Sequence, residues 1–292
     1  MNLRILNYFL TVAQEQNITR AADILHITQP TLSRQLTQLE EDLGVALLDR
    51  SSKKLALTPA GDLLVHRGKE IVALIEKTEQ EIKDQETNLS GNISFGAGEY
   101  KTVELLADII KAFQDKYPAV TFDIFTSTAD VLKEKMEKGL LDISLLLAPV
   151  DITNYNFLLL PYKEKWGILM HSDSPLSAKE AITPEDLSHL PVMPPTRLSA
   201  RNKVFNWLSG NVANMKFVGT CNLKGNVIII VLRSRYYAFT IEPSVLNTDE
   251  LCFRPLDPPL VSEMYLAWRR GANFSPTVQK FIEFAQCFLS MK

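Results

Sequence analysis

The chain has 292 residues, of which 46% are hydrophobic. This length predicts two or more compact units, and the composition, with 12 Gly and 15 Pro, favours a soluble globular protein. The apolar run at 227–232 is too short to cross a bilayer, and the N-terminal helix lacks the long apolar core and cleavage site of a signal peptide. These features argue against a secreted or membrane-inserted protein, so we expect a cytoplasmic one.

The net charge of −3 is divided unevenly along the chain. Residues 1–69 hold eight Lys or Arg against seven Asp or Glu, residues 70–88 hold two against six, and residues 89–292 hold 21 of each. A nucleic-acid binder with this balance must depend on where its cations lie, with a dimer doubling them.

The spacing of cysteines and histidines predicts no metal site. Cys221, Cys252 and Cys287 are odd in number and widely spaced, which fits a reducing compartment. We expect structural cysteines, with a redox-sensing thiol as the alternative. The four histidines show no metal-ligand spacing, so we expect neither a metal nor a cofactor.

A first helix is predicted over 1–15, with its apolar side packed behind the two helices that follow. Thr19 can cap a short second helix that runs to Leu25. Two residues then remain for the turn at 26–27, and so short a turn is typical of a helix-turn-helix.

The third helix has two faces of different character. Thr28 is a suitable N-cap, Pro30 falls in the first turn where a missing N–H costs nothing, and Gly44 ends the helix. The inward face is a stripe of Leu32, Leu36, Leu39 and Leu43. The outer face offers hydrogen-bonding groups near its start and acidic residues at 40–42, so it would meet DNA with its N-terminal end. An ordinary amphipathic helix with a solvated outer face is the alternative.

Two short strands at 45–50 and 55–58 predict the wing of a winged helix. Arg50, Lys53 and Lys54 lie together there and can reach phosphates or the minor groove. A basic turn that only adds solubility is the alternative, and the adjacent helix-turn-helix favours the wing.

Five motifs in this region resemble the DNA-binding domain of the LysR-type transcriptional regulators. They are TRAAxxL at 19–25, TQPTLSRQL at 28–36, LExxLG at 39–44, LLxR at 47–50 and LTxAG at 57–61. Leu48 departs from the family, which usually has Phe there; we expect a change in packing and not in function. The resemblance implies DNA contacts by Thr19, Thr28, Gln29, Pro30, Thr31, Ser33, Arg34, Gln38, Arg50, Lys53 and Lys54.

A long helix is predicted from Pro59 to about residue 88, in a linker that spans 59–89. Thr58 before Pro59 is a strong helix start. Coiled-coil spacing relates Leu64, Ile71, Ile75 and Ile82. In the resembling family this helix pairs two subunits, so we expect a homodimer or homotetramer. Packing of the helix on the chain's own second domain is the alternative.

Strands and helices alternate from residue 91 onward. Strands are predicted at 92–97, 120–125 and 142–147, with helices at 101–116 and 129–138 between them. This βαβαβ order implies a mostly parallel sheet with right-handed crossovers. The segments GxIxxG at 91–96, FxxxYPxV at 113–120 and GxLDI at 139–143 resemble the family's effector-binding domain, which is built like periplasmic solute-binding proteins.

The expected fold class is therefore multidomain, mixed α+β and α/β. It comprises a winged helix-turn-helix at 1–58, the linker helix at 59–89 and a two-lobed, periplasmic-binding-protein-like domain at 90–292. Lobe I covers about 90–161 and 266–292, and lobe II about 162–265. Further strands are predicted at 191–193, 215–220, 236–241 and 265–268, and further helices at 201–209, 225–233 and 276–289.

Three polar junctions after predicted strands are candidates for ligand binding at the carboxyl ends of the sheet. They contribute Glu99, Tyr100, Lys101 and Thr102; Ser127 and Thr128; and Pro195, Thr196 and Arg197. Hydroxyls and free N–H groups at helix starts suit a small carboxylate effector, which Arg197 or Arg201 could clamp. Plain helix capping by Ser and Thr is the alternative. Residues 231–237 lack the glycines that the family often has there, so this rim of the cleft could be filled.

The resemblance implies a transcriptional regulator and no enzyme. Its partners would be double-stranded operator DNA, a small-molecule effector and RNA polymerase. We expect no association with a membrane. An effector between the lobes would change the spacing of the DNA-binding domains in a dimer or tetramer. A solute-binding protein is one rival, disfavoured by the missing signal peptide and by 88 residues that this task does not need. An enzyme with an α/β core is the other, but no nucleophile–base pair, P-loop or dinucleotide fingerprint occurs.

Overall fold

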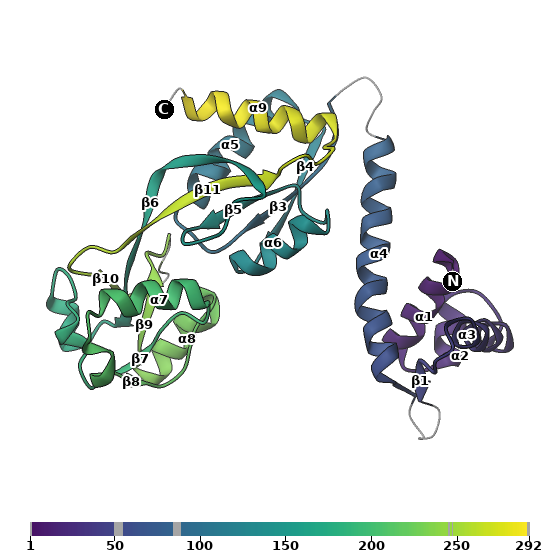
Figure 1. Ribbon diagram of the computed structural model, residues 1–292, viewed down its shortest axis with the longest axis horizontal. Helices are drawn as coiled ribbons and strands as arrows, with labels where there is room; N and C mark the ends of the chain where they lie inside the picture. The colour runs from purple at the N-terminus through teal and green to yellow at the C-terminus, as the bar shows by residue number, and fades with distance from the viewer. Residues whose placement is uncertain (1, 50–54, 84–88, 245, 247, 291–292) are drawn as a thin grey trace. The chain divides into compact units, whose positions relative to one another are not determined.

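The computed structural model describes residues 2–49, 55–83, 89–244, 246 and 248–290. The chain divides into two compact units, Met1–Ile82 and Lys83–Lys292 (Figure 1). Two predicted features lie outside the described residues, namely the basic wing tip with Arg50, Lys53 and Lys54 and the last part of the linker helix at 84–88.

The N-terminal unit is a winged helix. Its elements are α1 (Leu3–Glu15), α2 (Ile18–Ile24), α3 (Gln29–Leu43), β1 (Leu48–Asp49), β2 (Ala56–Leu57) and α4 (Pro59–Lys83). The α3 side chains of Leu32, Leu36 and Leu39 are at most 1% exposed and pack in one core with Phe9 of α1. Leu43, the fourth predicted member of the stripe, is 43% exposed, so the buried stripe ends one turn before the helix does.

Two capping predictions are corrected. The N-cap of α2 is Asn17, whose Oδ1 accepts a hydrogen bond from the backbone N–H of Arg20 at 3.1 Å, and Thr19 lies inside the first turn. Thr28 is the N-cap residue of α3, but its hydroxyl pairs with the Thr31 hydroxyl at 2.8 Å and caps no backbone N–H. Gly44 ends α3 as predicted, at a φ of 68° that favours glycine.

The wing strands are shorter than predicted, since β1 and β2 pair antiparallel over two residues each. Glu40 of α3 fastens the wing, because its Oε1 accepts hydrogen bonds from the backbone N–H groups of Leu47 and Leu48 at 2.8 and 3.0 Å. One acidic residue at the end of α3 therefore has a structural role that the sequence pattern did not indicate.

The predicted start of α4 is confirmed. Thr58 Oγ accepts from the Gly61 N–H at 3.0 Å, and its hydroxyl donates to the carbonyl of Ala46 at 2.7 Å. A Cβ atom at Gly61 would lie 2.1 Å from the carbonyl oxygen of Leu47. The glycine of the LTxAG motif thus lets the helix start approach the wing closely.

The C-terminal unit is built on one mixed sheet with the strand order β4-β3-β5-β11-β6-β9-β7-β8, and β10 also pairs with β6. The strands are β3 (Gly91–Ala97), β4 (Val120–Thr126), β5 (Ile143–Leu147), β6 (Tyr155–His171), β7 (Pro191–Met193), β8 (Lys216–Phe217), β9 (Tyr237–Ile241), β10 (Leu251–Pro255) and β11 (Val261–Arg269). β3 pairs parallel with β4 and with β5, which confirms the predicted βαβαβ arrangement.

The sequence did not predict β6 or β10 as strands. β6 is 17 residues long; its first part pairs with β11, and its last part pairs with β9 and β10. It therefore runs from one lobe into the other through residue 162, where the lobe boundary was expected. β11 is longer than the predicted strand at 265–268 and also runs between the lobes.

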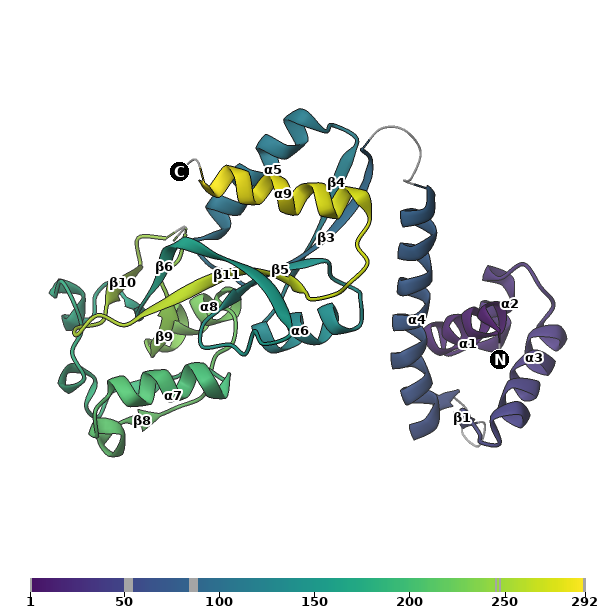
Figure 2. The ribbon, with the colours of Figure 1, turned by 45° about the horizontal axis from the view of Figure 1, so that its top comes forward.

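Helices cover both faces of the sheet in the first lobe. α5 (Val103–Lys116) and α9 (Pro276–Ser290) lie on one face and α6 (Ala129–Glu137) lies on the other (Figures 1 and 2). Rings of Phe95, Phe113 and Phe281 meet edge to face in the core beneath α5 and α9. The second lobe has α7 (Leu198–Trp207) and α8 (Lys224–Ser234).

Candidate DNA-binding face and interlobe cavity

The outer face of α3 forms a shallow groove of polar side chains. Its lining consists of Gln29, Pro30, Ser33, Arg34, Thr37, Gln38 and Glu41. Arg34 is exposed, and no ion pair or hydrogen bond engages its guanidinium within the described part of the chain. The buried leucine face holds this helix in place, so the outer face is available for a partner.

The other predicted DNA-binding residues differ in their exposure and in their hydrogen-bond partners. Thr31 is exposed, but its hydroxyl is paired with Thr28. Gln38 donates to Asp42 at 3.1 Å, which leaves its carbonyl oxygen available. Thr19 is exposed in the first turn of α2.

The described part of α4 presents an exposed apolar face. Leu63, Ile71 and Leu74 are 61%, 39% and 42% exposed. Leu64, a predicted dimer residue, is instead partly buried against the core of its own unit. Ile75 is half-buried, and the side chain of Ile82 lies outside the described residues. Ile71, which was also a predicted dimer residue, belongs to the exposed face. That face therefore overlaps the predicted seam at Ile71 and departs from it at Leu64.

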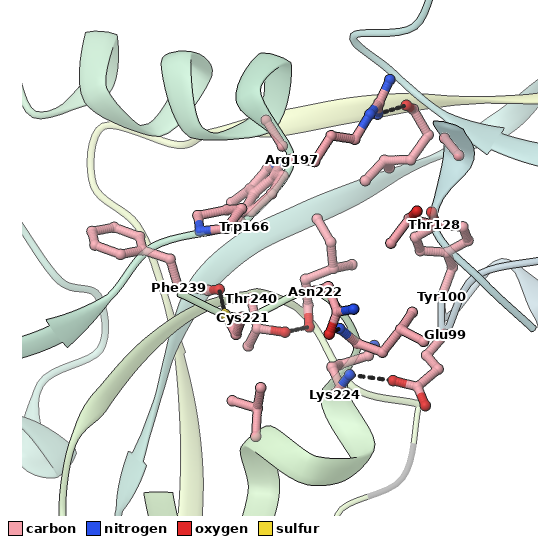
Figure 3. A pocket seen from close by; sticks show the side chains of 17 residues that line it. Glu99, Tyr100, Thr128, Trp166, Arg197, Cys221, Asn222, Lys224, Phe239 and Thr240 are labelled. Carbon is pink, nitrogen blue, oxygen red and sulfur yellow. Dashed lines mark hydrogen bonds between the residues drawn. The ribbon is translucent and has the colours of Figure 1, made fainter. Parts of the chain in front are cut away.

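A cavity lies between the two lobes of the C-terminal unit (Figure 3). Its lining includes five of the predicted effector residues, namely Glu99, Tyr100, Thr128, Pro195 and Arg197. Sequence reasoning missed its other polar and aromatic members, which are Trp166, Cys221, Asn222, Lys224, Phe239 and Thr240. Leu147, Val227 and Ile241 add to the apolar wall.

Arg197 ties the lobes together and does not point a free guanidinium into the cavity. It donates to Asp130 at 3.1 Å, to the carbonyl of Leu147 at 3.1 Å and to the carbonyl of Pro149 at 2.7 Å. Its side chain is 13% exposed. The predicted role as a ligand clamp is therefore replaced by a structural one, and Arg201 is not among the lining residues.

Glu99 also bridges the lobes. It follows β3 in the first lobe, and its Oε2 accepts hydrogen bonds from the backbone N–H groups of Lys224 and Gly225, the latter at 3.2 Å, at the start of α8 in the second lobe. Figure 3 shows the Glu99 carboxylate directed toward Lys224.

Four predicted effector residues lie away from this cavity. The backbone N–H and the hydroxyl of Thr102 donate to the buried Glu164 at 2.7 and 2.5 Å. Lys101 pairs with Glu242 at 3.3 Å, and both Lys101 and Thr102 line a separate hollow beside β6. Neither Ser127 nor Thr196 is among the cavity-lining residues. Thr196 donates to the hydroxyl of Thr220 at 3.0 Å.

Burial controls the ionisation of three cavity groups. It raises the pKa of Tyr100 to about 12, against a lowering effect of Arg197. It also raises the pKa of Cys221 to about 12, so this thiol stays protonated and unreactive near neutral pH. Burial lowers the pKa of Lys224, while Glu164, Glu99 and Glu242 act in the opposite direction.

The bulky segment at 231–237 does not fill the cavity. None of its residues lines the cavity, because α8 meets the cavity with its first turns, at Lys224 and Val227, and the segment lies at the other end of the helix. Arg235 ends α8 at a φ of 58° and forms an ion pair with Asp173. Of the two possibilities that the sequence left open for this rim, a filled or an open cleft, the structure shows the open one.

Within the described ranges, no group of three or more His, Cys, Asp or Glu side chains is placed to hold a metal ion. In the same part of the chain, no helix is both long enough and apolar enough to span a bilayer.

Known proteins resemble this chain over its whole length. The family described as "Bacterial regulatory helix-turn-helix protein, lysR family" matches residues 3–62, and the family described as "LysR substrate binding domain" matches residues 86–289. The Bacillus subtilis regulator BsdA is 39% identical over 143 residues, which is 49% of each chain. AlsR of the same organism is 27% identical over 300 residues, covering 98% of this chain and 96% of AlsR.

Solved structures show the same fold. CbnR, a LysR family transcriptional regulator, superposes with a TM-score of 0.78 at 19% identity over 99% of both chains. CbnR complexed with its target DNA gives a TM-score of 0.77 at 19% identity over 98% of this chain and 99% of CbnR. Taken with the two family matches, these findings identify the chain as a member of the LysR family, a DNA-binding transcriptional regulator with a C-terminal substrate-binding domain.

Proposed function

We propose that this regulator reads its operator with residues 28–38 of the winged helix and is controlled by a small molecule bound between the lobes. The observation that supports the first part best is the division of α3 into two faces. Leu32, Leu36 and Leu39 are buried, whereas Gln29 and Arg34 are exposed. These side-chain types bind adenine and guanine edges in the major groove.

Each expected domain has one proposed role. Residues 1–58 bind DNA, residues 59–89 pair subunits, and residues 90–292 bind the effector, with lobes at about 90–161 plus 266–292 and about 162–265. Arg50, Lys53 and Lys54 would neutralise phosphates beside the groove. RNA polymerase is the further partner of the assembled regulator, and the cytoplasm is its proposed location.

Pairing of subunits through α4 has support in its exposed apolar face. A helix surface with Leu63, Ile71 and Leu74 exposed is costly in water and becomes favourable when a second copy covers it. We propose a homodimer, or a homotetramer built from such dimers, through this face, which retains Ile71 of the predicted seam and does not include Leu64.

The cavity supports a binding role in place of a catalytic one. Its thiol is held protonated by burial, and its arginine is engaged by three acceptors. Its apolar wall and its few polar groups resemble a binding site for a small organic molecule. The proposed effector is therefore bound and released unchanged, without a cofactor.

The test of DNA reading uses the full chain and a pool of random duplexes. Wild-type protein should enrich a two-fold symmetric site. Arg34→Ala should bind that site at least about tenfold more weakly, which corresponds to one lost bidentate base contact. Arg4→Ala, at an exposed position on α1, is the matched control and should bind normally. Equal binding by Arg34→Ala and wild type would contradict the assignment of α3.

A further inference from the structure

The start of α8 is capped from another lobe. Its own N-cap residue, Leu223, provides no side-chain hydrogen bond. The first N–H groups of a helix lack partners inside the helix and attract negative charge. Here a carboxylate 125 residues away in sequence, that of Glu99, accepts from the N–H of Lys224 and also from that of Gly225.

This carboxylate lies inside the interlobe cavity and not on an outer surface. Glu99, Lys224 and Asn222 all line the cavity, together with the hydroxyls of Tyr100 and Thr128 (Figure 3). The Lys224 side chain is half-buried, and its ammonium donates to the carbonyl of Glu242 at 3.3 Å. The polar end of the cavity therefore combines a cation, two backbone donors and neutral donors with the Glu99 carboxylate, while Glu164 and Glu242 also act on Lys224 electrostatically.

We propose that Glu99 occupies the anion position of the effector cavity, so that a ligand carboxylate binds there by displacing it. This inference rests on the proposed effector-binding function of the cavity. The exchange replaces one carboxylate by another, so the charge facing Lys224 and α8 is unchanged. A neutral ligand in the same position would leave a half-buried ammonium and two N–H groups less well satisfied.

The other lining residues of the cavity determine which shape and polarity the ligand has beyond its carboxylate. Trp166 is 4% exposed, and its indole N–H already donates to Ser262 at 2.9 Å, so it offers an apolar surface. Phe239 and Val227 extend that surface. The ligand class is therefore a small monocarboxylate with a flat or compact apolar body, and Tyr100 and Thr128 can donate to any further oxygen that it has.

Displacement of Glu99 also changes how the lobes are held. Glu99 and Arg197 both bridge the lobes beside the cavity. A ligand that takes the place of Glu99 breaks the hydrogen bonds between this first-lobe carboxylate and the start of α8, while the Arg197 contacts stay. The lobes stay joined by β6, by β11 and by the ion pair of Lys101 with Glu242. Loss of the Glu99 contacts permits a change in the angle between them, which supplies the conformational change that a regulator needs.

The experiment uses the full chain with benzoate and its neutral isostere benzamide, measured by calorimetry. Removing the internal competitor should tighten benzoate binding by about tenfold or more in Glu99→Ala, by less in Glu99→Gln, and should change benzamide binding by less than about threefold. Adding Lys224→Met to Glu99→Ala should abolish the gain. Glu180→Gln, an exposed carboxylate away from the cavity, should bind both probes as wild type does.

A second measurement needs no ligand. Hydrogen exchange at the amides of Lys224 and Gly225 should be faster in Glu99→Ala than in wild type, and benzoate should restore the protection. Unchanged exchange, or benzoate affinity equal in wild type and Glu99→Ala, would overturn the proposal. If other metabolites bind the wild-type cavity while benzoate binds no variant, this inference fails and the effector-controlled regulator stands. If no compound in a broad screen binds, the proposed effector function itself fails.

Discussion

At the scale of single residues, several polar side chains hold one element to another, and the sequence suggested other roles for them. Glu40 was expected to lie on a solvated acidic face, but it accepts two backbone N–H groups of the wing. Arg197 was expected to clamp a ligand, but it donates to three acceptors of the first lobe. Residue type and local position indicate which bonds a side chain can form, and only the tertiary arrangement decides its partner.

Replacement of Glu40 by alanine should weaken the N-terminal unit. Two partly buried N–H groups would lose their acceptor, and unmade hydrogen bonds of this kind cost about 1–3 kcal/mol of unfolding free energy. Urea unfolding of the full chain, followed at the N-terminal unit, measures this loss. Glu41→Ala, at the exposed neighbouring position, should stay within about 0.5 kcal/mol of wild type. Equal stability of the two variants would show that Glu40 does not hold the wing.

Replacement of Arg197 by lysine should loosen the contact between the lobes. The donors of lysine all lie on one nitrogen atom, so lysine cannot reach the three acceptors that the planar guanidinium reaches with separate nitrogens. We therefore expect a loss of about 2–3 kcal/mol in the unfolding free energy of the C-terminal unit. Arg201→Lys, at a position outside the cavity lining, is the control. A change of similar size in both variants would argue against a specific role for Arg197.

At the scale of elements, periodicity and end signals predicted most helices well. The leucine stripe and Gly44 placed α3, and Thr58 with Pro59 placed the start of α4. β6 was missed because it serves two lobes in turn. Its buried positions are scattered in the first half and continuous from Trp166 to Met170 in the second, so neither an alternating nor a uniformly apolar pattern covers it.

The sequence predicted some of the cavity-lining residues and missed others. Strand ends and helix starts meet at one edge of a sheet, which is why Glu99, Tyr100 and Thr128 were found. Trp166 lies within the missed strand, and Lys224 begins a helix whose first residue was expected at 225. Thr102 was misplaced because its partner, Glu164, lies in β6.

Two glycines of the N-terminal unit should respond differently to alanine. At Gly61 a Cβ would lie 2.1 Å from the backbone oxygen of Leu47, whereas at Gly68 it would lie 2.9 Å from the end of the Leu6 side chain. A backbone atom cannot move cheaply, so Gly61→Ala should cost about 2–3 kcal/mol. At Gly68→Ala, the shift of a flexible side chain is partly offset by a gain in helix propensity of about 1 kcal/mol. Thermal unfolding compares the two, and an equal or larger loss at Gly68 would contradict this ranking.

At the scale of the whole molecule, the DNA-binding unit is too nearly neutral to bind a long operator alone. Residues 1–69 have eight Lys or Arg against seven Asp or Glu, so affinity depends on the few cations on one face and on their repetition. Two copies double the phosphate contacts and read two half-sites. The exposed apolar face of α4 is a described surface that can bring the copies together.

Disruption of that face should therefore remove both the dimer and operator binding. Leu74→Glu places a charge on the 42% exposed apolar face, and a dimer that buries this position would have to desolvate two carboxylates. Sedimentation at micromolar concentration should show a dimer or tetramer for wild type and a monomer for Leu74→Glu, with operator affinity reduced by at least about a hundredfold. Lys69→Glu introduces the same side chain at another exposed position of α4 and should leave the assembly intact. If Leu74→Glu stays dimeric while Ile75→Glu does not, the subunits pair through the face first predicted from the heptad spacing.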